Sequence, residues 1–428
     1  MFKYILKCDP AKVSKNNYTW NIIASFVNAS ESVILVASAS RILDIDSAGV
    51  MTLALAISTL LLNVGKYSIR GYQTTDVKER FSYDSYYSFR IMTVALMIIS
   101  CICYLLYKVL CGEFNTYKAL IVFLLCLIYA IEAMEDVFLG QYQSINRLDV
   151  ASKVFTFRWI AIILIFCISL LFLRNMVLSL LLSVVFSLAI DILLIHDANI
   201  VTKNKKAHFH TKQVLDLAKQ CFPLFASTFL FFFITTAPKL SIDRYLTAKD
   251  QACYGVIAMP ILVIDLLSNF LYQPQLVEMA QEWKENRIKS LIKRIRIQIL
   301  YISLITCFGI ICAYTFGCAL FSKLFSIDVM AYRCEFSILL LASGIFALLS
   351  YASMILAIIR KHLIHFIGMF IISILSIIGF NPITYNYGIS GIVVYYLALV
   401  SISALINLSA LIVLIHRNNK KTWHSPIT

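Results

Sequence analysis

Acidic side chains inside long apolar stretches are the residues of this sequence best suited to chemistry within a membrane. Glu132, Glu135 and Asp136 follow an i, i+3, i+4 spacing, which places them on one face of a helix. Glu31 and Asp265 each lie well inside another apolar stretch. An ionised side chain at the centre of a bilayer costs about 2.5–3.5 kcal/mol, so it is kept where it meets an ionic partner or a water-filled cavity. We therefore expect these five carboxylates to bind a coupling ion, H⁺ or Na⁺, or to hold a gate through ion pairs.

A second set of candidates is basic and lies mostly at the ends of apolar stretches: Arg41, Lys66, Arg70, Lys239 and Arg244. Arg and Lys hold phosphate and pyrophosphate groups through charge and hydrogen bonds. We expect these residues to line the path of an anionic substrate, with Asp243 pairing with one of the cations. The alternative is structural, because long basic side chains near the end of a span can reach water.

Signatures of an enzyme are scarce in this chain. It has neither a GxxxxGK phosphate loop nor a GxSxG nucleophile motif. The Asp44-Ile45-Asp46 triplet resembles the metal-binding carboxylate pair of many glycosyltransferases, but it has no domain beside it to hold a nucleotide sugar. Two histidine pairs have metal-like spacing without matching ligands, namely His208 with His210 and His362 with His365. We expect no catalytic residue, no resident metal and no organic cofactor.

The composition explains where these side chains must be placed. Of 428 residues, 60% are hydrophobic and only 14% are charged, against about 25% charged in a soluble domain. This excludes a soluble globular protein and a disordered one. The apolar stretches are long and unbroken, unlike the alternating segments of about 10 residues in a membrane β-barrel. With about 20 apolar residues for each crossing, the sequence predicts an all-α integral membrane protein of about twelve spans.

The basic residues also indicate the orientation and the division of the chain. Roughly three quarters of the 37 Lys and Arg residues fall in loops on one side, which predicts that both termini are cytoplasmic. Trp20, Trp159 and Trp283 fall near the predicted cytoplasmic ends of spans, where tryptophan is typical of interfacial anchors. A polar loop lies at the midpoint of the chain, after the sixth predicted span. We therefore expect an N-terminal six-helix bundle over 1–210 and a C-terminal one over 211–428, related as parallel repeats.

Proline is concentrated in one part of the chain. Pro223, Pro238, Pro260 and Pro274 are four of its seven prolines, and they fall in the seventh and eighth predicted spans. Proline removes a backbone donor and clashes with the preceding turn, so these spans are expected to be kinked. Bent packing and a hinge or gate are equally compatible with this pattern.

The segment Thr236-Ala-Pro238-Lys239-Leu-Ser-Ile-Asp243-Arg244-Tyr245 resembles the end of the seventh span in bacterial polysaccharide flippases. Tyr254-Gly255 through Pro260 and Phe270-Leu-Tyr272-Gln273-Pro274 are similar to that family too, as are Arg41-Ile-Leu and Arg70-Gly71-Tyr72-Gln73. The pattern departs at Leu43-Asp44, where the family commonly has Leu-Gly. The family is the O-antigen or capsule repeat-unit flippases of the multidrug/oligosaccharidyl-lipid/polysaccharide exporter superfamily.

The resemblance implies two six-helix bundles around a central cavity that opens alternately to each side of the bacterial cytoplasmic membrane. It implies an undecaprenyl-pyrophosphate-linked oligosaccharide as substrate for O-antigen, capsule or exopolysaccharide synthesis. The polymerase and chain-length machinery of that pathway are the implied partners, and no nucleic acid is. Two alternatives stay open: an ion-coupled multidrug exporter of the same fold, and a membrane polysaccharide polymerase. The second alternative is disfavoured because polymerases usually carry a large outside loop, and no predicted outside loop here exceeds about 20 residues.

Overall fold

The computed structural model describes residues 3–6, 12–76, 80–202, 208–209, 213–261, 264, 267–268, 275–359 and 361–423, and these are almost entirely helical. The chain divides into two compact units, Met1–Phe232 and Phe233–Thr428. Within the described ranges, nine helical segments are long and apolar enough to cross a membrane. The chain is thus an all-α, multi-pass membrane protein, as the composition predicts. The total of about twelve spans, the boundary at 210–211 and the cytoplasmic termini stay predictions.

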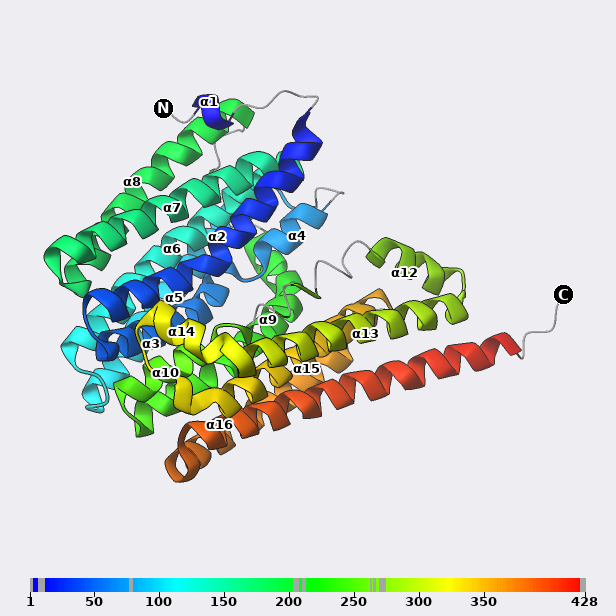
Figure 1. Ribbon diagram of the computed structural model, residues 1–428. Coiled ribbons are helices and arrows are strands. Elements are labelled where there is room, and N and C mark those ends of the chain that lie inside the picture. The colour runs from blue at the N-terminus through cyan, green and yellow to red at the C-terminus, as the bar shows by residue number, and fades with distance from the viewer. Residues whose placement is uncertain are drawn as a thin grey trace. The chain divides into compact units, whose positions relative to one another are not determined.

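The first unit is a bundle of long helices. Its elements are α1 (Lys3–Leu6), α2 (Val13–Ile42), α3 (Ile45–Lys66), α4 (Ile69–Thr75), α5 (Tyr83–Leu110), α6 (Thr116–Ser144), α7 (Leu148–Leu173), α8 (Met176–Thr202) and the first part of α9 (Val214–Tyr245). Helix α6 is central, since it packs against α3, α4, α5, α7 and α8, while α2 covers α7. Figure 1 shows α2, α6, α7 and α8 running alongside one another. The acidic face of α6 is therefore enclosed by neighbouring helices.

Large apolar side chains cover the outer faces of these helices. Leu106 on α5, Phe172 on α7 and Leu188 on α8 are all well exposed. A soluble monomer rarely exposes so much apolar surface, whereas a membrane protein turns it toward lipid. The bundle thus has a lipid-facing exterior and a polar interior around α6.

The turn between α2 and α3 is set by Asp44. Its carboxylate accepts a hydrogen bond from the backbone N–H of Ser47 at 2.6 Å, and its extended backbone makes it the N-cap of α3. An aspartate cap satisfies an amide that the first helical turn leaves without a partner. The departure from the flippase pattern at Leu43-Asp44 therefore gives this turn a capped helix start.

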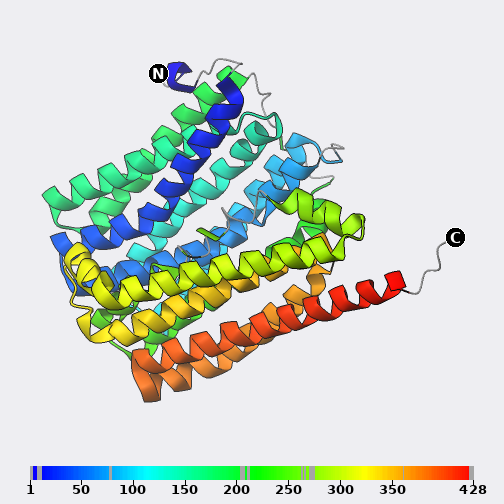
Figure 2. The same ribbon diagram turned by 45° about the vertical axis from the view of Figure 1, so that its right-hand side comes forward.

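The second unit contains the rest of α9, followed by α10 (Ala248–Ala258), α12 (Leu276–Lys284), α13 (Ile288–Cys312), the π-helical turn η3 (Ala313–Gly317), α14 (Cys318–Phe325), η4 (Met330–Tyr332), α15 (Arg333–Ile358) and α16 (His362–Trp423). Helix α15 packs against both α13 and α16. Figure 2 shows these three helices side by side in the yellow-green to red part of the chain. Cys318 and Cys334, which flank the connection to α15, are free thiols.

Helix α16 is two helices folded back on each other at Gly388. That residue has φ 59° and ψ −147°, a conformation that L side chains rarely adopt. Beyond it, the Tyr395 hydroxyl donates to the Leu375 carbonyl at 2.8 Å, and its ring packs edge-on against Phe380. The reversal separates two stretches that the sequence predicts as distinct spans, 364–381 and 389–415.

Two of the four prolines named above lie inside α9, which continues as a helix through both Pro223 and Pro238. Pro260 lies in the turn directly after α10, and Pro274 lies outside the described residues. A backbone interruption is therefore seen beside Pro260. The proposed hinge role of all four stays a prediction.

A polar cluster joins α12 to the start of α13. Glu282 accepts hydrogen bonds from the Ser290 hydroxyl at 2.7 Å and from the Arg294 guanidinium at 3.1 Å. Burial opposes the charge of Glu282, but the hydrogen bonds from Arg294 and Ser290 outweigh it and lower the pKa of this carboxyl. The cluster fixes the short amphipathic helix α12 against the membrane helix that follows it.

This cluster predicts how stability depends on pH. A carboxyl whose pKa is lower in the folded state stabilises the fold above its unfolded pKa, and this contribution is lost as the pH falls toward the folded value. We expect the thermal unfolding midpoint of Glu282→Gln to fall less between pH 7 and acidic pH than that of the unaltered protein. The control is Glu285→Gln, which removes an exposed carboxylate in the same turn. Equal acid sensitivity in both variants would contradict the assignment.

Candidate functional site

Four acidic side chains gather in the interior of the first unit. Glu132, Glu135 and Asp136 lie on α6 and Glu31 lies on α2, and each is at most 6% exposed. The i, i+3, i+4 spacing turns the three α6 carboxylates to the same region, as the sequence predicts. Buried charges require ionic or hydrogen-bonding partners, so the side chains around them decide what the site can do.

Glu132 has three partners from two neighbouring helices. The Lys66 ammonium at the end of α3 lies 2.7 Å from its Oε1. On the other oxygen, the Arg158 guanidinium of α7 lies at 3.2 Å, and the Trp159 indole N–H donates at 2.9 Å. Two cations and one neutral donor on a single carboxylate hold it in the ionised state.

Arg158 also binds the next acid along the face. Its Nε donates to Glu135 Oε2 at 2.5 Å, and both side chains are fully buried. One guanidinium therefore bridges two carboxylates that are three residues apart on α6, close to one helical turn. Arginine suits this role because its planar group donates in several fixed directions at once.

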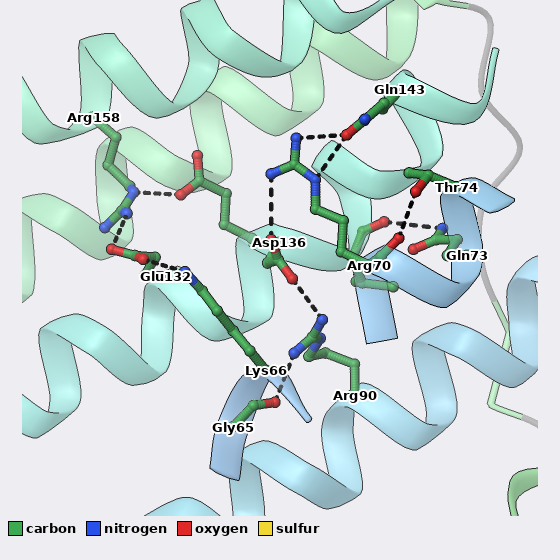
Figure 3. A network of polar contacts seen from close by, with 12 residues as sticks. Gly65, Lys66, Arg70, Gln73, Thr74, Arg90, Glu132, Asp136, Gln143 and Arg158 are labelled. Atoms are coloured by element: carbon green, nitrogen blue, oxygen red, sulfur yellow. Dashed lines mark hydrogen bonds and ion pairs between the residues drawn. The ribbon is translucent and has the colours of Figure 1, made fainter. Parts of the chain in front are cut away.

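Asp136 is held by two arginines from different helices. Arg90 of α5 contacts its Oδ2 at 2.7 Å, and Arg70 of α4 contacts its Oδ1 at 3.4 Å. Arg90 also donates to the Gly65 carbonyl at 2.6 Å, which ties the end of α3 to the network. Arg70 donates two further hydrogen bonds to Gln143. Figure 3 shows Lys66 and Arg158 converging on Glu132 while Arg70 and Arg90 converge on Asp136.

The close approach of α3, α5 and α6 depends on a small residue at the end of α3. A Cβ built on Gly65 would lie 2.7 Å from Met97 Sδ and 2.9 Å from Ala133 Cβ. No side chain larger than hydrogen fits there without displacement. The glycine therefore lets its own carbonyl approach Arg90 and brings Lys66 within reach of Glu132.

Glu31 is the acidic residue of this set that no described cation contacts directly. Its Oε1 accepts a hydrogen bond from the Tyr129 hydroxyl at 2.8 Å, and its buried Oε2 has no hydrogen-bond partner among the described residues. Glu135 Oε1 and Arg158 Nη1 are likewise buried without a hydrogen bond in that part of the chain. The network thus retains unused acceptors and donors that a proton, an ion or water can occupy.

The residues proposed from the sequence fall into two groups. Glu31, Glu132, Glu135 and Asp136, expected as ion-coupling or gating residues, meet Lys66 and Arg70, which were expected to line a substrate path. The remaining basic candidates lie elsewhere: Arg41 at the exposed end of α2, and Lys239 and Arg244 with Asp243 near the end of α9. Asp265 lies outside the described residues. The structure therefore joins two predicted sets into one ionic network in the first unit.

Two central cations, Arg90 and Arg158, were missed. Hydropathy places the starts of two spans near 90 and 157, so the sequence alone puts both arginines at span ends. The helices begin earlier, at Tyr83 and Leu148, so both arginines lie two turns or more inside them. Trp159 is also not an interfacial anchor, since it is fully buried and donates to Glu132. The sequence feature that could have identified Arg158 is its position on a helix next to α6 in the chain, because the carboxylates of α6 require cationic partners.

Comparisons with known proteins identify the fold. No protein-family model matches the chain, and no curated protein matches its sequence. Among solved structures, an inward-facing multidrug resistance MATE family transporter of the MOP superfamily superposes with a TM-score of 0.69, at 10% identity, covering 93% of this chain and 96% of that one. An outward-facing MATE family transporter gives 0.61 at 12% identity, covering 97% and 98%.

A third match is a MOP superfamily transporter from Pyrococcus furiosus, described as having a binding pocket of reverse polarity that suggests a different function. It gives a TM-score of 0.55 at 12% identity and covers 97% of this chain and 98% of that one. The chain therefore has the fold of MATE family transporters of the MOP superfamily over nearly its whole length.

Proposed function

We propose that this protein moves undecaprenyl-pyrophosphate-linked oligosaccharides across the bacterial inner membrane by alternating access. The observation that carries the proposal is Lys239. It lies inside the membrane helix α9, about 9 Å from the end of that helix at 1.5 Å per residue, and is only partly buried. Among the described residues, its ammonium has neither an ion pair nor a hydrogen bond. A lysine kept at such a cost without a protein partner is suited to an anionic substrate group.

The acidic network supports an anionic substrate over a cationic one. The three carboxylates on α6 are each engaged by Lys66, Arg70, Arg90 or Arg158. They are therefore not available as a negative lining for cationic drugs. The resemblance in α9 around Lys239 and Arg244 points to the same class of substrate.

The second candidate is an ion-coupled multidrug exporter, which is favoured by what the MATE neighbours are named for. A fold of this kind does not by itself fix the charge of the substrate, as the description of the Pyrococcus furiosus transporter indicates for that protein. The two candidates differ in substrate charge, and that difference can be measured.

The test uses purified full-length protein in proteoliposomes. We expect the protein to transfer a pyrophosphate-linked oligosaccharide lipid between the two leaflets. The transfer is measured by how much of the sugar becomes accessible to an added lectin or glycosidase. We expect no accumulation of ethidium under an imposed H⁺ or Na⁺ gradient. In cells, deletion of the gene should remove surface polysaccharide and leave the lipid-linked repeat unit on the cytoplasmic leaflet. Ethidium transport without lipid transfer would replace the proposal with the exporter.

Glu31 is the residue proposed to couple transport to an ion. It is buried, has one unused carboxylate oxygen, and depends on the neutral Tyr129 rather than a cation for its hydrogen bond. We expect Glu31→Gln to lower gradient-driven transfer of the lipid-linked oligosaccharide about tenfold, which corresponds to the loss of one interaction of about 1.4 kcal/mol. Binding of the same lipid in the absence of a gradient should be unchanged. The measurement is transfer with and without an imposed pH or Na⁺ gradient, with the exposed Glu285→Gln as control. An unaltered gradient response in Glu31→Gln would remove this residue from coupling.

A further inference from the structure

A groove on the lipid-facing side of the first unit is separate from the arginine-bound carboxylates of α6. It has a volume of about 630 Å³ and lies between α5, α6 and α8. Its walls are mostly apolar, and include Val94 and Ile98 on α5, Leu127 and Met134 on α6, and Leu188 on α8. Leu188 is half exposed, so the groove is open on the surface that membrane lipid covers. A groove of this size can enclose the chain of a small amphiphile.

One charged group lines this apolar groove. Asp191 of α8 is only 5% exposed, and its Oδ1 is buried without a hydrogen-bond partner among the described residues. No ion pair of Asp191 is found in the same part of the chain. His196 and Asn199 line the groove one and two turns further along α8. A buried carboxylate with an unused oxygen in an otherwise apolar groove favours a ligand that brings its own hydrogen-bond donor.

The surrounding charges favour a cationic donor. Among the described residues, four carboxylates belong to the network at α6 and a fifth lines the groove, namely Glu31, Glu132, Glu135, Asp136 and Asp191. The cations that contact or face them are four, namely Lys66, Arg70, Arg90 and Arg158. Arg158 of α7 acts on Asp191 through its charge, but no ion pair joins them among the described residues: Nε and Nη2 donate to Glu135 and Glu132, and Nη1 is buried without a hydrogen-bond partner. These nine side chains thus include one more carboxylate than cations, and Asp191 is the carboxylate among them that lines the groove.

We propose that this groove binds a protonated lipophilic amine that enters from the membrane, with its ammonium on Asp191 and its hydrocarbon chain against α5 and α6. The amine supplies the missing donor and charge, and the chain covers the apolar walls. An anionic amphiphile would be repelled by the carboxylate, and a neutral alcohol would donate a hydrogen bond to it without balancing its charge. This site is distinct from the proposed path of the oligosaccharide at Lys239, so it can exist whether or not that substrate is correct.

The first test measures access to Asp191 with dicyclohexylcarbodiimide, an apolar reagent that adds to the protonated form of a carboxyl group reached from lipid, so the reaction is run at mildly acidic pH. In vesicles containing the full-length protein, we expect peptide mass spectrometry to find the adduct at Asp191. N,N-dimethylhexadecylamine, a tertiary amine that cannot form an amide with the activated carboxyl, should slow its formation about tenfold more than hexadecanol does, which corresponds to 1.4 kcal/mol for the added ionic contact. Equal protection by the two amphiphiles would reduce the groove to a site for any lipid chain, and absence of the adduct would show that Asp191 is not reached from the membrane.

Two variants separate filling of the groove from general disturbance of the helix. Leu188→Trp places a larger side chain in the groove and should slow the reaction at Asp191 without further protection by N,N-dimethylhexadecylamine. Leu193→Trp makes the same change at an equally exposed position on α8 outside the groove, and should behave as the unaltered protein. If both variants react alike, the groove is not the route to Asp191.

The second test measures stabilisation, since a ligand that binds the folded state raises the thermal unfolding midpoint. We expect hexadecylamine to raise the midpoint more than hexadecanol does in the unaltered protein. In Asp191→Asn that difference should disappear, while the shift caused by hexadecanol stays the same. A full amine-specific shift in Asp191→Asn would place the cation elsewhere and overturn the proposal.

Discussion

Replacing Arg158 with glutamine is expected to cost about 3–5 kcal/mol of folding free energy, since removing one partner of a buried ion pair leaves uncompensated charge. Arg158 is fully buried and contacts both Glu132 and Glu135. Among the described residues, its loss would leave Glu135 without an ion-pair partner and Glu132 with Lys66 alone. We expect a large drop in the thermal unfolding midpoint of the detergent-purified protein. The matched control is Arg296→Gln on α13, which alters an exposed arginine and should have little effect.

The same experiment can separate charge from packing. Adding Glu132→Gln and Glu135→Gln to Arg158→Gln removes all three charges together and leaves no unpaired ion behind. Replacing a buried ionic group as a whole is often close to neutral, so we expect this triple variant to recover most of the lost stability. A triple variant as unstable as Arg158→Gln would mean that Arg158 acts through shape and hydrogen bonding rather than through charge.

The acidic half of this network could be predicted from the sequence, but its basic half could not. Carboxylates on α6 stand out because they interrupt a long apolar stretch at helical spacing. Arg90 and Arg158 lie where hydropathy falls, so they look like the ends of spans. In the structure, Arg90 pairs with Asp136 and Arg158 pairs with Glu135. Because each guanidinium has a carboxylate partner, both arginines can lie inside a buried helix and need not mark its end. The hydropathy pattern of a single helix does not show these ion pairs, because each pair joins residues of two different helices.

Some local features of the fold could be predicted from the sequence and others could not. The reversal at Gly388 was expected from two separated apolar stretches, and a glycine with positive φ is what makes it possible. The role of Asp44 as the cap of α3 was not foreseen, since a carboxylate pair in a loop resembled a metal motif instead. The burial of Trp159 was not foreseen either, because tryptophan at a predicted span end is typical of an interface. The burial of Trp159 depends on the acidic face of α6, which packs against it, whereas the cap at Asp44 is a local feature of its own turn.

Removing the charge of Lys239 is expected to have the largest effect on transport. A hydrogen bond to a charged group contributes about 1.5–3 kcal/mol, so Lys239→Ala should lower transfer of the lipid-linked oligosaccharide by roughly ten- to a hundredfold. Lys239→Arg keeps the charge at the same position in α9 and should retain most of the activity. The measurement is the initial rate of transfer between leaflets in proteoliposomes at matched protein content.

The control for this pair is Lys249→Ala, which removes an exposed lysine near the start of α10. It should leave the rate unchanged, so a loss confined to Lys239→Ala cannot be attributed to the overall positive charge of the chain. The two candidate substrates have opposite charges, so Lys239→Ala should change their transport in opposite directions. If the protein exported cations, removing an ammonium from the span would relieve repulsion and raise ethidium transport, whereas an anionic pyrophosphate loses its contact. Loss with the lipid-linked substrate and no gain with ethidium is therefore the result expected of a flippase, and the reverse pattern is that of a drug exporter.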